Sequence, residues 1–182
     1  AAYCCELPAS VAASAAAMMT WIFFDAIRGK KVSAMGACIG AVVGLVAITP
    51  AAGYVTVSHA LFIGFASSII SNLAVRAKNK SNLDDTLDVF PCHGIGGISG
   101  MILTGVFAKD VGLFYGHTTT FMYHMLALAI VSVYTFGGSY LLYKITDKIV
   151  PLRVSLQEEI DGLDFTQHGE TYKLKKPAAN VN

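Results

Sequence analysis

Charge is what this sequence has least of. Of its 182 residues only 14% are Asp, Glu, Lys or Arg, against roughly 25% in a typical soluble domain. Residues 32–75 contain none of these four residue types, and neither do residues 89–108. With 54% hydrophobic residues and a mean hydropathy of +0.57, these stretches exclude a disordered chain and argue against an ordinary water-soluble domain. The net charge of +1 offers no basic surface for nucleic acid.

Several sequence signatures are also absent. The four cysteines form no Cys-x-x-Cys pair, and Cys38 and Cys92 lie inside apolar runs, so we expect no disulfide scaffold. There is no P-loop, dinucleotide fingerprint or Gly-x-Ser-x-Gly motif. The histidines and acidic residues do not have the spacing of a metal site. We therefore expect no cofactor, no metal and no enzymatic activity.

What the sequence does contain is a series of long apolar segments. Each can cross a hydrocarbon core of about 30 Å at about 1.5 Å of rise per residue. Backbone groups in lipid must pair within the segment, and strand-like alternation is missing, so the segments are predicted to be helices. We expect an all-α integral membrane protein, with a polytopic helical bundle over residues 1–151 and a polar tail over 152–182. The segments are approximately 8–27, 32–50, 54–75, 86–108 and 118–143.

Positive charge between the segments predicts the orientation. Nine lysines and arginines follow the first, third and fifth segments, whereas the loops on the opposite side contain only Lys109. By the positive-inside rule, the N-terminus lies outside a cell membrane and the tail lies in the cytoplasm. The nine cations are Arg28, Lys30, Lys31, Arg76, Lys78, Lys80, Lys144, Lys148 and Arg153.

Small residues recur at helical spacing. Gly36, Gly40 and Gly44 follow one another every four residues, as do Gly96 and Gly100. This pattern favours close packing of helix backbones. The alternative is that the close helices frame a narrow pore. The aromatic residues near the end of the first segment, Trp21 among them, are predicted to form an interfacial belt.

His93 is the main candidate for a functional role, because an ionisable side chain inside a membrane helix is costly and imidazole can pass a proton near neutral pH. Helical spacing places Val89, His93, Gly97 and Gly100 on one face, where they could line a lumen. The alternative is a buried histidine that donates a hydrogen bond to a backbone carbonyl. A Cys92–His93 nucleophile pair is disfavoured, since adjacent side chains on a helix point about 100° apart.

Three carboxylates and a proline surround the start of the fourth segment. Asp84, Asp85 and Asp88 can accept hydrogen bonds from free N–H groups at a helix start, which predicts a structural role. Pro91 would kink the fourth helix near His93 if that helix began near Asp84.

Three motifs together resemble the ammonium transporter family. The first is Asp84-Asp-Thr-Leu-Asp-Val-Phe-Pro-Cys-His-Gly-Ile-Gly-Gly97, the second runs from Gly44 to Tyr54, and the third runs from Glu158 to Glu170. The resemblance extends to about Thr171, although Pro91-Cys92 stands where the family is expected to have Gly-Val. It implies eleven spans, the first ten as two inverted halves, and a trimer with one pore per subunit. This chain then resembles a C-terminal fragment with spans seven to eleven, which agrees with a start at Ala-Ala-Tyr instead of Met.

The resemblance also assigns roles to individual residues. His93 matches the second of the family's paired pore histidines, and Val89 matches an apolar pore-lining position one turn away. Val42 and Thr49 match positions along the conduction path. Asp88 matches an acidic residue of structural importance. The tail segment matches a cytosolic region that, in prokaryotic members, lies near the docking site of a PII-type regulatory protein; its residues are Gln167, His168, Gly169 and Glu170.

The implied function is ammonium transport. NH4+ is recruited outside, ammonia crosses a narrow apolar pore lined by histidine, and the proton is relayed separately. The implied partners are ammonium or ammonia, the lipid bilayer and two further copies of the chain in a homotrimer. The alternative is an ammonium sensor of the same fold that signals through its tail. The chain by itself, with half of the pore wall, is not expected to conduct.

Overall fold

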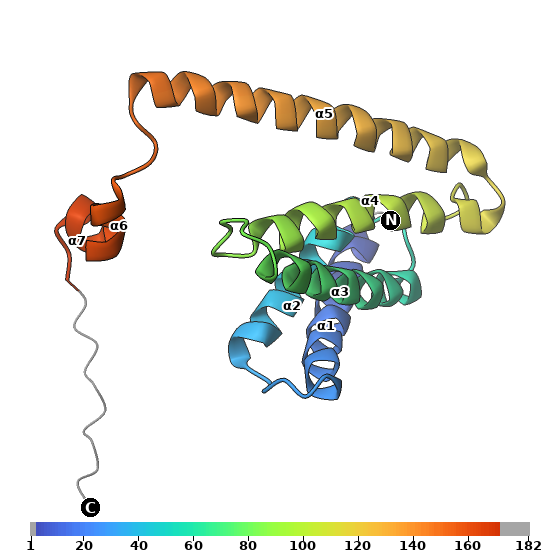
Figure 1. Ribbon diagram of the computed structural model, residues 1–182. Helices are drawn as coiled ribbons and strands as arrows, with labels where there is room; N and C mark the ends of the chain where they lie inside the picture. Colours follow the sequence, from blue (N-terminus) through green and yellow to red (C-terminus); the bar gives the residue numbers. More distant parts are fainter. Residues whose placement is uncertain (1–2, 172–182) are drawn as a thin grey trace, which may run out of the picture. The chain divides into compact units, whose positions relative to one another are not determined.

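The computed structural model describes residues 3–171, and all regular secondary structure in that range is helical (Figure 1). This confirms the predicted all-α membrane fold. The chain divides into two compact units, residues 1–132 and 133–182, which are described separately below. The helices are α1 (Tyr3–Ile27), α2 (Ala34–Ile48), α3 (Val57–Asn79), the π-helical turn η1 (Phe90–Ile95), α4 (Gly96–Phe107), the 3-10 turn η2 (Leu113–Tyr115), α5 (Thr118–Ile149), α6 (Leu156–Asp161) and α7 (Leu163–His168).

Among residues 3–171, four helical segments are long and apolar enough to cross a membrane: α1, α3, α5, and η1 together with α4. The second apolar helix is shorter than expected, because α2 has 15 residues, or about 22 Å at 1.5 Å per residue. Its start is fixed by Ser33, whose hydroxyl accepts a hydrogen bond of 3.0 Å from the Gly36 N–H. Pro50 lacks the N–H that a further turn would need, so α2 ends at Ile48.

Glycines let α1, α2, α3 and α4 approach one another at backbone distance. A Cβ atom built on Gly44 of α2 would lie 2.5 Å from the Ala13 carbonyl oxygen of α1, and one on Gly64 of α3 would also meet the Ala13 backbone. A Cβ on Gly100 of α4 would overlap the Ala47 carbonyl of α2. These glycines therefore serve helix packing, the first of the two interpretations above, and Gly100 does not share an exposed face with His93.

Trp21 lies in this packed interior. It is only 4% exposed and packs against Gly36 and Gly40, whose added Cβ atoms would lie 3.4 Å from its ring and 2.7 Å from its Cβ. The predicted place of Trp21 in an interfacial belt is therefore wrong, because the two glycines open a slot that the indole fills.

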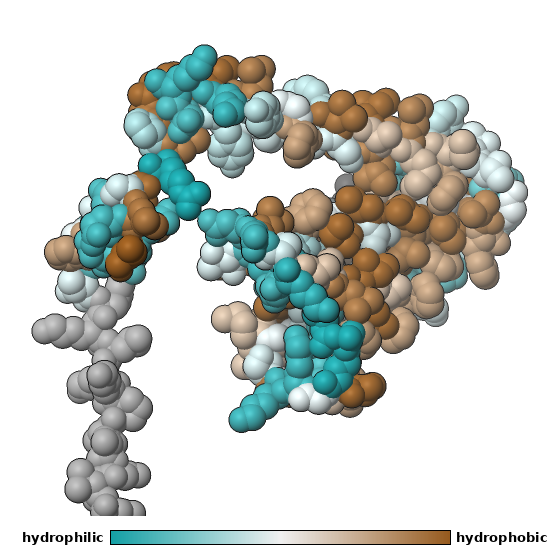
Figure 2. Space-filling model, in the orientation of Figure 1, coloured by the Kyte–Doolittle hydropathy of each residue, from teal (hydrophilic) through white to brown (hydrophobic). Residues whose placement is uncertain are grey.

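The outer surface of the first unit is largely apolar, and its interior contains paired polar groups. Figure 2 shows hydrophobic residues over much of the visible face of α3 and α4. Inside, the Ser68 hydroxyl donates a 2.8 Å hydrogen bond to the Ala17 carbonyl, and the Ser99 and Ser67 hydroxyls lie 2.9 Å apart. The interior also contains buried apolar side chains such as Ile48 and Ile63. In lipid, small residues that let helices approach closely and interhelical hydrogen bonds of this kind help to hold such a bundle together.

We predict that Gly44→Ala destabilises the bundle by about 1–3 kcal/mol, because the added methyl meets a backbone carbonyl that cannot move aside. The measurement is thermal unfolding in detergent followed by circular dichroism. Gly97→Ala is the matched control, since its added Cβ would make an ordinary 4.0 Å contact with Val46 Cγ1. Equal unfolding temperatures for the two variants would contradict the close approach of α1 and α2.

Candidate functional site

His93 lies in η1, the first turn of the fourth transmembrane helix, and its side chain is exposed. Within the described part of this chain, no other element buries it. Pro91 is the second residue of η1, where a missing backbone N–H costs no intrahelical hydrogen bond. The helix begins at Phe90, so Pro91 starts the helix and does not kink it. The local irregularity is instead the wider π-helical turn that contains His93.

The contacts of α4 with α2 show where His93 lies relative to α2. Gly96 of α4 lies near Val43 and Val46, and Gly100 lies against Ala47, so the contact points advance in the same direction along both helices. Gly97, one turn after His93, also approaches Val46, one turn after Val42. His93 and Val42 therefore each lie one helical turn before the Gly97–Val46 contact, His93 on η1 and Val42 on the adjoining α2.

The other predicted pore residues are also exposed. Val89, directly before η1, is 51% exposed, and Val42 on α2 is 41% exposed. Thr49 follows α2 directly and is exposed, with its hydroxyl donating a 2.8 Å hydrogen bond to the Leu45 carbonyl. The structure thus leaves all four predicted lining residues, His93 included, at the surface of the first unit.

Cys92 points away from His93. It is 5% exposed and belongs to a buried cluster with Trp21 and Val43. A thiol in that position packs between helices, which agrees with the expectation that Cys92 and His93 do not form a nucleophile pair.

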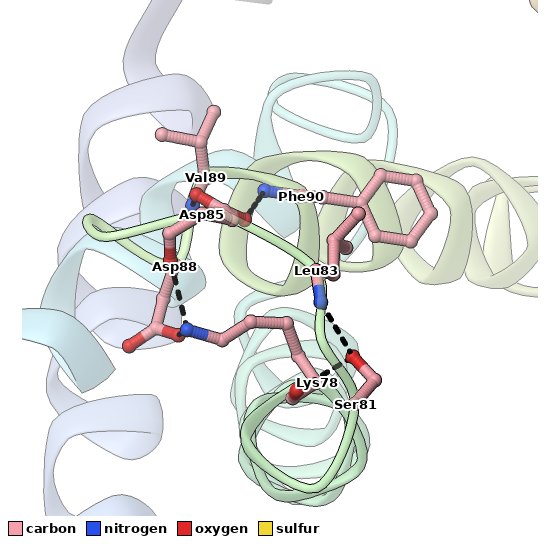
Figure 3. Close-up of polar contacts among 7 residues, drawn as sticks. All are labelled: Lys78, Ser81, Leu83, Asp85, Asp88, Val89 and Phe90. Atoms are coloured by element: carbon pink, nitrogen blue, oxygen red, sulfur yellow. Dashed lines mark hydrogen bonds and ion pairs between the residues drawn. The ribbon is translucent and has the colours of Figure 1, made fainter. Parts of the chain in front are cut away.

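A network of polar contacts fixes the loop that leads into η1 (Figure 3). The Asp85 carboxylate accepts two hydrogen bonds of 2.9 Å, one from the Val89 N–H and one from the Phe90 N–H. Lys78 Nζ lies 2.7 Å from Asp88 Oδ1 and donates a 2.8 Å hydrogen bond to the Asp85 carbonyl. Asp85 therefore caps the start of the helix, whereas Asp88 joins the loop to the end of α3.

Two details of this network were not visible in the sequence. Asp88 has a φ angle of +54°, a left-handed conformation that is uncommon for a residue other than glycine. The sequence suggested for Lys78 only a contribution to the orientation in the membrane. Its ion pair with Asp88 depends on the path of the turn between them, which the sequence does not specify. The two backbone hydrogen bonds to Phe90 and Val89 lower the pKa of Asp85 from its ordinary value of 3.8.

In the second unit, the predicted regulatory segment lies at the end of α7. Gln167 and His168 form its last turn, and Gly169 ends it with a φ angle of +68°. The Glu170 N–H donates a 2.9 Å hydrogen bond to the Asp164 carbonyl. The preceding α6 starts with a reciprocal pair of hydrogen bonds between Ser155 and Glu158. The Glu158 carboxylate accepts hydrogen bonds from the Ser155 backbone N–H and hydroxyl, which lower its pKa. The last residues, 176–182, which the sequence predicts to be disordered, lie outside the described residues.

Comparisons with known proteins agree on one class. A family model described as the Ammonium Transporter Family matches residues 5–173. The chain is 41% identical over 166 residues to an ammonium transporter of Bacillus subtilis, which covers 87% of this chain and 41% of that protein. It is 39% identical over 162 residues to the ammonium transporter Amt1 of Archaeoglobus fulgidus, covering 86% of this chain and 41% of the relative.

Solved structures give the same result. The crystal structure of Mep2 from Saccharomyces cerevisiae matches with a TM-score of 0.80 and 31% identity, covering 86% of this chain and 38% of that one. A structure named Sensor Amt Protein matches with a TM-score of 0.81 at 24% identity, a likeness of fold alone.

Apolar helices of this length and this arrangement define a polytopic α-helical membrane protein. The chain belongs to the ammonium transporter family. It spans about two fifths of the length of the curated relatives it matches.

The capping role of Asp85 predicts a pH dependence of stability. Because the folded pKa is lowered, ionised Asp85 stabilises the folded state above pH 3.8, and this contribution is lost as the pH falls through the lower folded pKa. Asp85→Asn should lower the unfolding temperature at neutral pH, and its deficit relative to the unaltered protein should shrink on acidification. Asp84→Asn, which removes an exposed neighbouring carboxylate, is the control. A deficit that is independent of pH would refute the assignment.

Proposed function

We propose that this chain forms part of an ammonium transporter in which His93 lines a narrow, apolar conduction path. The observation that carries the proposal is the common exposure of His93, Val89, Val42 and Thr49, which come from two adjoining elements of an otherwise closely packed bundle. The names of the relatives support ammonium as the substrate, since the matched proteins of Bacillus subtilis and Archaeoglobus fulgidus are both called ammonium transporters.

The physical chemistry of the path favours neutral ammonia as the species that crosses. A bare NH4+ ion loses its hydration in an apolar passage at a large free-energy cost, whereas NH3 loses little. The valines supply the apolar wall. A neutral imidazole at His93 offers one hydrogen-bond donor and one acceptor to a solute that has both. The proton that ammonium leaves behind is then relayed separately along histidine.

An exposed imidazole lines a pore only if other helices cover its face. We propose that further spans of the transporter fold do so, which accords with the share of about two fifths that this chain represents in its relatives. The complete transporter is proposed to be a homotrimer with one path per subunit. The 182-residue chain alone is not expected to conduct.

The same proposal includes orientation and regulation. By the positive-inside rule, the nine cations at or after the ends of α1, α3 and α5 support a cytoplasmic location for those ends in a cell membrane. The part of the chain that follows α5 then lies in the cytoplasm, where the exposed end of α7 is available to a PII-type regulatory protein. An ammonium sensor of the same fold is the alternative, for which the 24% identity with a sensor structure gives no specific support.

We predict that His93→Ala abolishes ammonium conduction or changes its selectivity, because the path loses the imidazole that offers ammonia a donor and an acceptor and that relays the proton. The measurement is ammonium-evoked current in proteoliposomes that contain the complete product of the reading frame encoding this sequence. His117→Ala, which removes an exposed histidine in the loop before α5, is the matched control and should conduct normally.

The 182-residue chain is measured in parallel. Current from the complete product but not from this chain would support a path completed by further spans. Unaltered current and selectivity in His93→Ala would contradict the proposal that His93 lines the conduction path. Silence from both preparations would favour the sensor alternative.

A further inference from the structure

Lys78, the next-to-last residue of α3, is held against the loop that follows this helix (Figure 3). Its side chain is only 12% exposed, with Nζ 2.7 Å from Asp88 Oδ1, and it donates a 2.8 Å hydrogen bond to the Asp85 carbonyl. Lys80, two residues later, is exposed. Either lysine satisfies the positive-inside rule, which requires charge and not contacts. Fixing a long lysine side chain costs conformational entropy, so the two contacts of Lys78 indicate a role beyond orientation.

The contacts of Lys78 close a tight turn from Asp85 to Asp88. The Asp85 carbonyl accepts hydrogen bonds from both Lys78 Nζ and the Asp88 N–H, the latter at 3.3 Å. The ion pair holds the side chain of Asp88, whose φ angle of +54° is uncommon for a residue that has a Cβ atom. Lys78 therefore stabilises a backbone conformation that Asp88 does not readily adopt by itself.

The backbone of Asp88 sets the start of the segment that contains His93. Val89 follows it directly, and the Asp88 carbonyl accepts a 3.0 Å hydrogen bond from the Cys92 N–H. Because rotation about the N–Cα bond of Asp88 moves this carbonyl, it also changes the direction in which Val89 and His93 leave the loop. Side chains that recognise a small solute must be held within about 0.5 Å of their working positions. The placement of the imidazole is thus sensitive to the conformation of Asp88.

We propose that Lys78 is a positioning residue for ammonium conduction. By holding Asp88 in the left-handed conformation, it fixes how Val89 and His93 face the conduction path. This role rests on the proposed function, because these two residues matter for transport only if they line the path. The contacts of Lys78, and not merely the charge that it adds at the end of α3, then determine how well the path distinguishes ammonium from methylammonium.

The first experiment compares ammonium and methylammonium currents in proteoliposomes that contain the complete product of the reading frame. The two ions have the same charge and differ by one methyl group, so the ratio of their currents does not depend on how much folded protein is inserted. In Lys78→Met we expect the ratio of ammonium to methylammonium current to fall by about tenfold, since a displacement of about 1 Å can cost up to about a hundredfold.

Lys80→Met makes the same change in net charge at the same helix end and is the matched control, which should keep the ratio of the unaltered protein. A ratio that does not fall in Lys78→Met would overturn the proposal. An equal fall in Lys80→Met would also overturn it, because the charge and not the contacts of Lys78 would then be responsible.

Glycine at position 88 tests whether Lys78 acts through the backbone. Glycine adopts positive φ angles without steric cost, so Lys78→Met combined with Asp88→Gly should recover most of the lost ratio. The matched control combines Lys78→Met with Asp88→Ala, which also removes the unpaired carboxylate but keeps a Cβ atom, and its ratio should stay low. Recovery in both double variants would show that Lys78 only neutralises Asp88, and recovery in neither would show that it acts elsewhere. Either result would overturn the proposal.

If Lys78→Met alone does not fold by circular dichroism, the two double variants are compared with the unaltered protein, and the same difference between glycine and alanine is expected. Hydrogen exchange separates positioning from transport. Exchange of the Val89 and Cys92 amides, whose hydrogen bonds form at this turn, should be faster in Lys78→Met and return to normal in the glycine double variant.

This second readout is made on the same protein in detergent and does not need a current. If the unaltered protein does not conduct, the proposed function fails, whereas this pattern of exchange would still support the placement of η1 by Lys78. Unchanged exchange in Lys78→Met would overturn the proposal whatever the currents are.

Discussion

The backbone carbonyl of Ala13, near the middle of α1, is the point on which the bundle depends. Gly44 of α2 and Gly64 of α3 both approach it so closely that a single methyl group at either position would overlap it. Three helices therefore meet where no side chain intervenes. Lipid tails give helices no hydrophobic reason to associate, so the stability of such a bundle rests on dispersion contacts and interhelical hydrogen bonds at this short range.

That close packing decides which side chains remain at the surface. Gly100 likewise lets α4 approach the backbone of Ala47 on α2. Cys92 is then buried in a cluster with Trp21 and Val43. Cys92 faces inward, and the next residue, His93, is exposed. The Asp85 cap and the Lys78–Asp88 ion pair then hold the entry to η1 in a fixed conformation. The exposed position of the imidazole thus follows from the packing of the helices and from the polar loop before η1.

Charged residues are also unevenly distributed along the chain. Ionisable groups are nearly absent from the spans and gather where the helices end. At one such place, between the end of α1 and the last turns of α3, a groove without an acidic residue in its wall is lined by Arg28, Lys30, Arg76 and Lys80. The cations that the positive-inside rule requires at helix ends are thus also brought together by the fold.

The sequence by itself determined the class of fold, the approximate spans, the family and the candidate residue His93. Apolar length, charge placement and short motifs are local properties, and they survive any arrangement of the helices. Local reasoning failed where a contact joins distant residues. Trp21 of α1 resembled an interfacial residue until Gly36 and Gly40 of α2 were seen to pack against it. The short α2 follows from local signals, the Ser33 cap and Pro50, which the sequence already contains. The partner of Asp88 and the convergence of Arg28 and Arg76 on one groove were decided only by tertiary structure, because each depends on how the helices and the loop between them are placed, which no sequence pattern specifies.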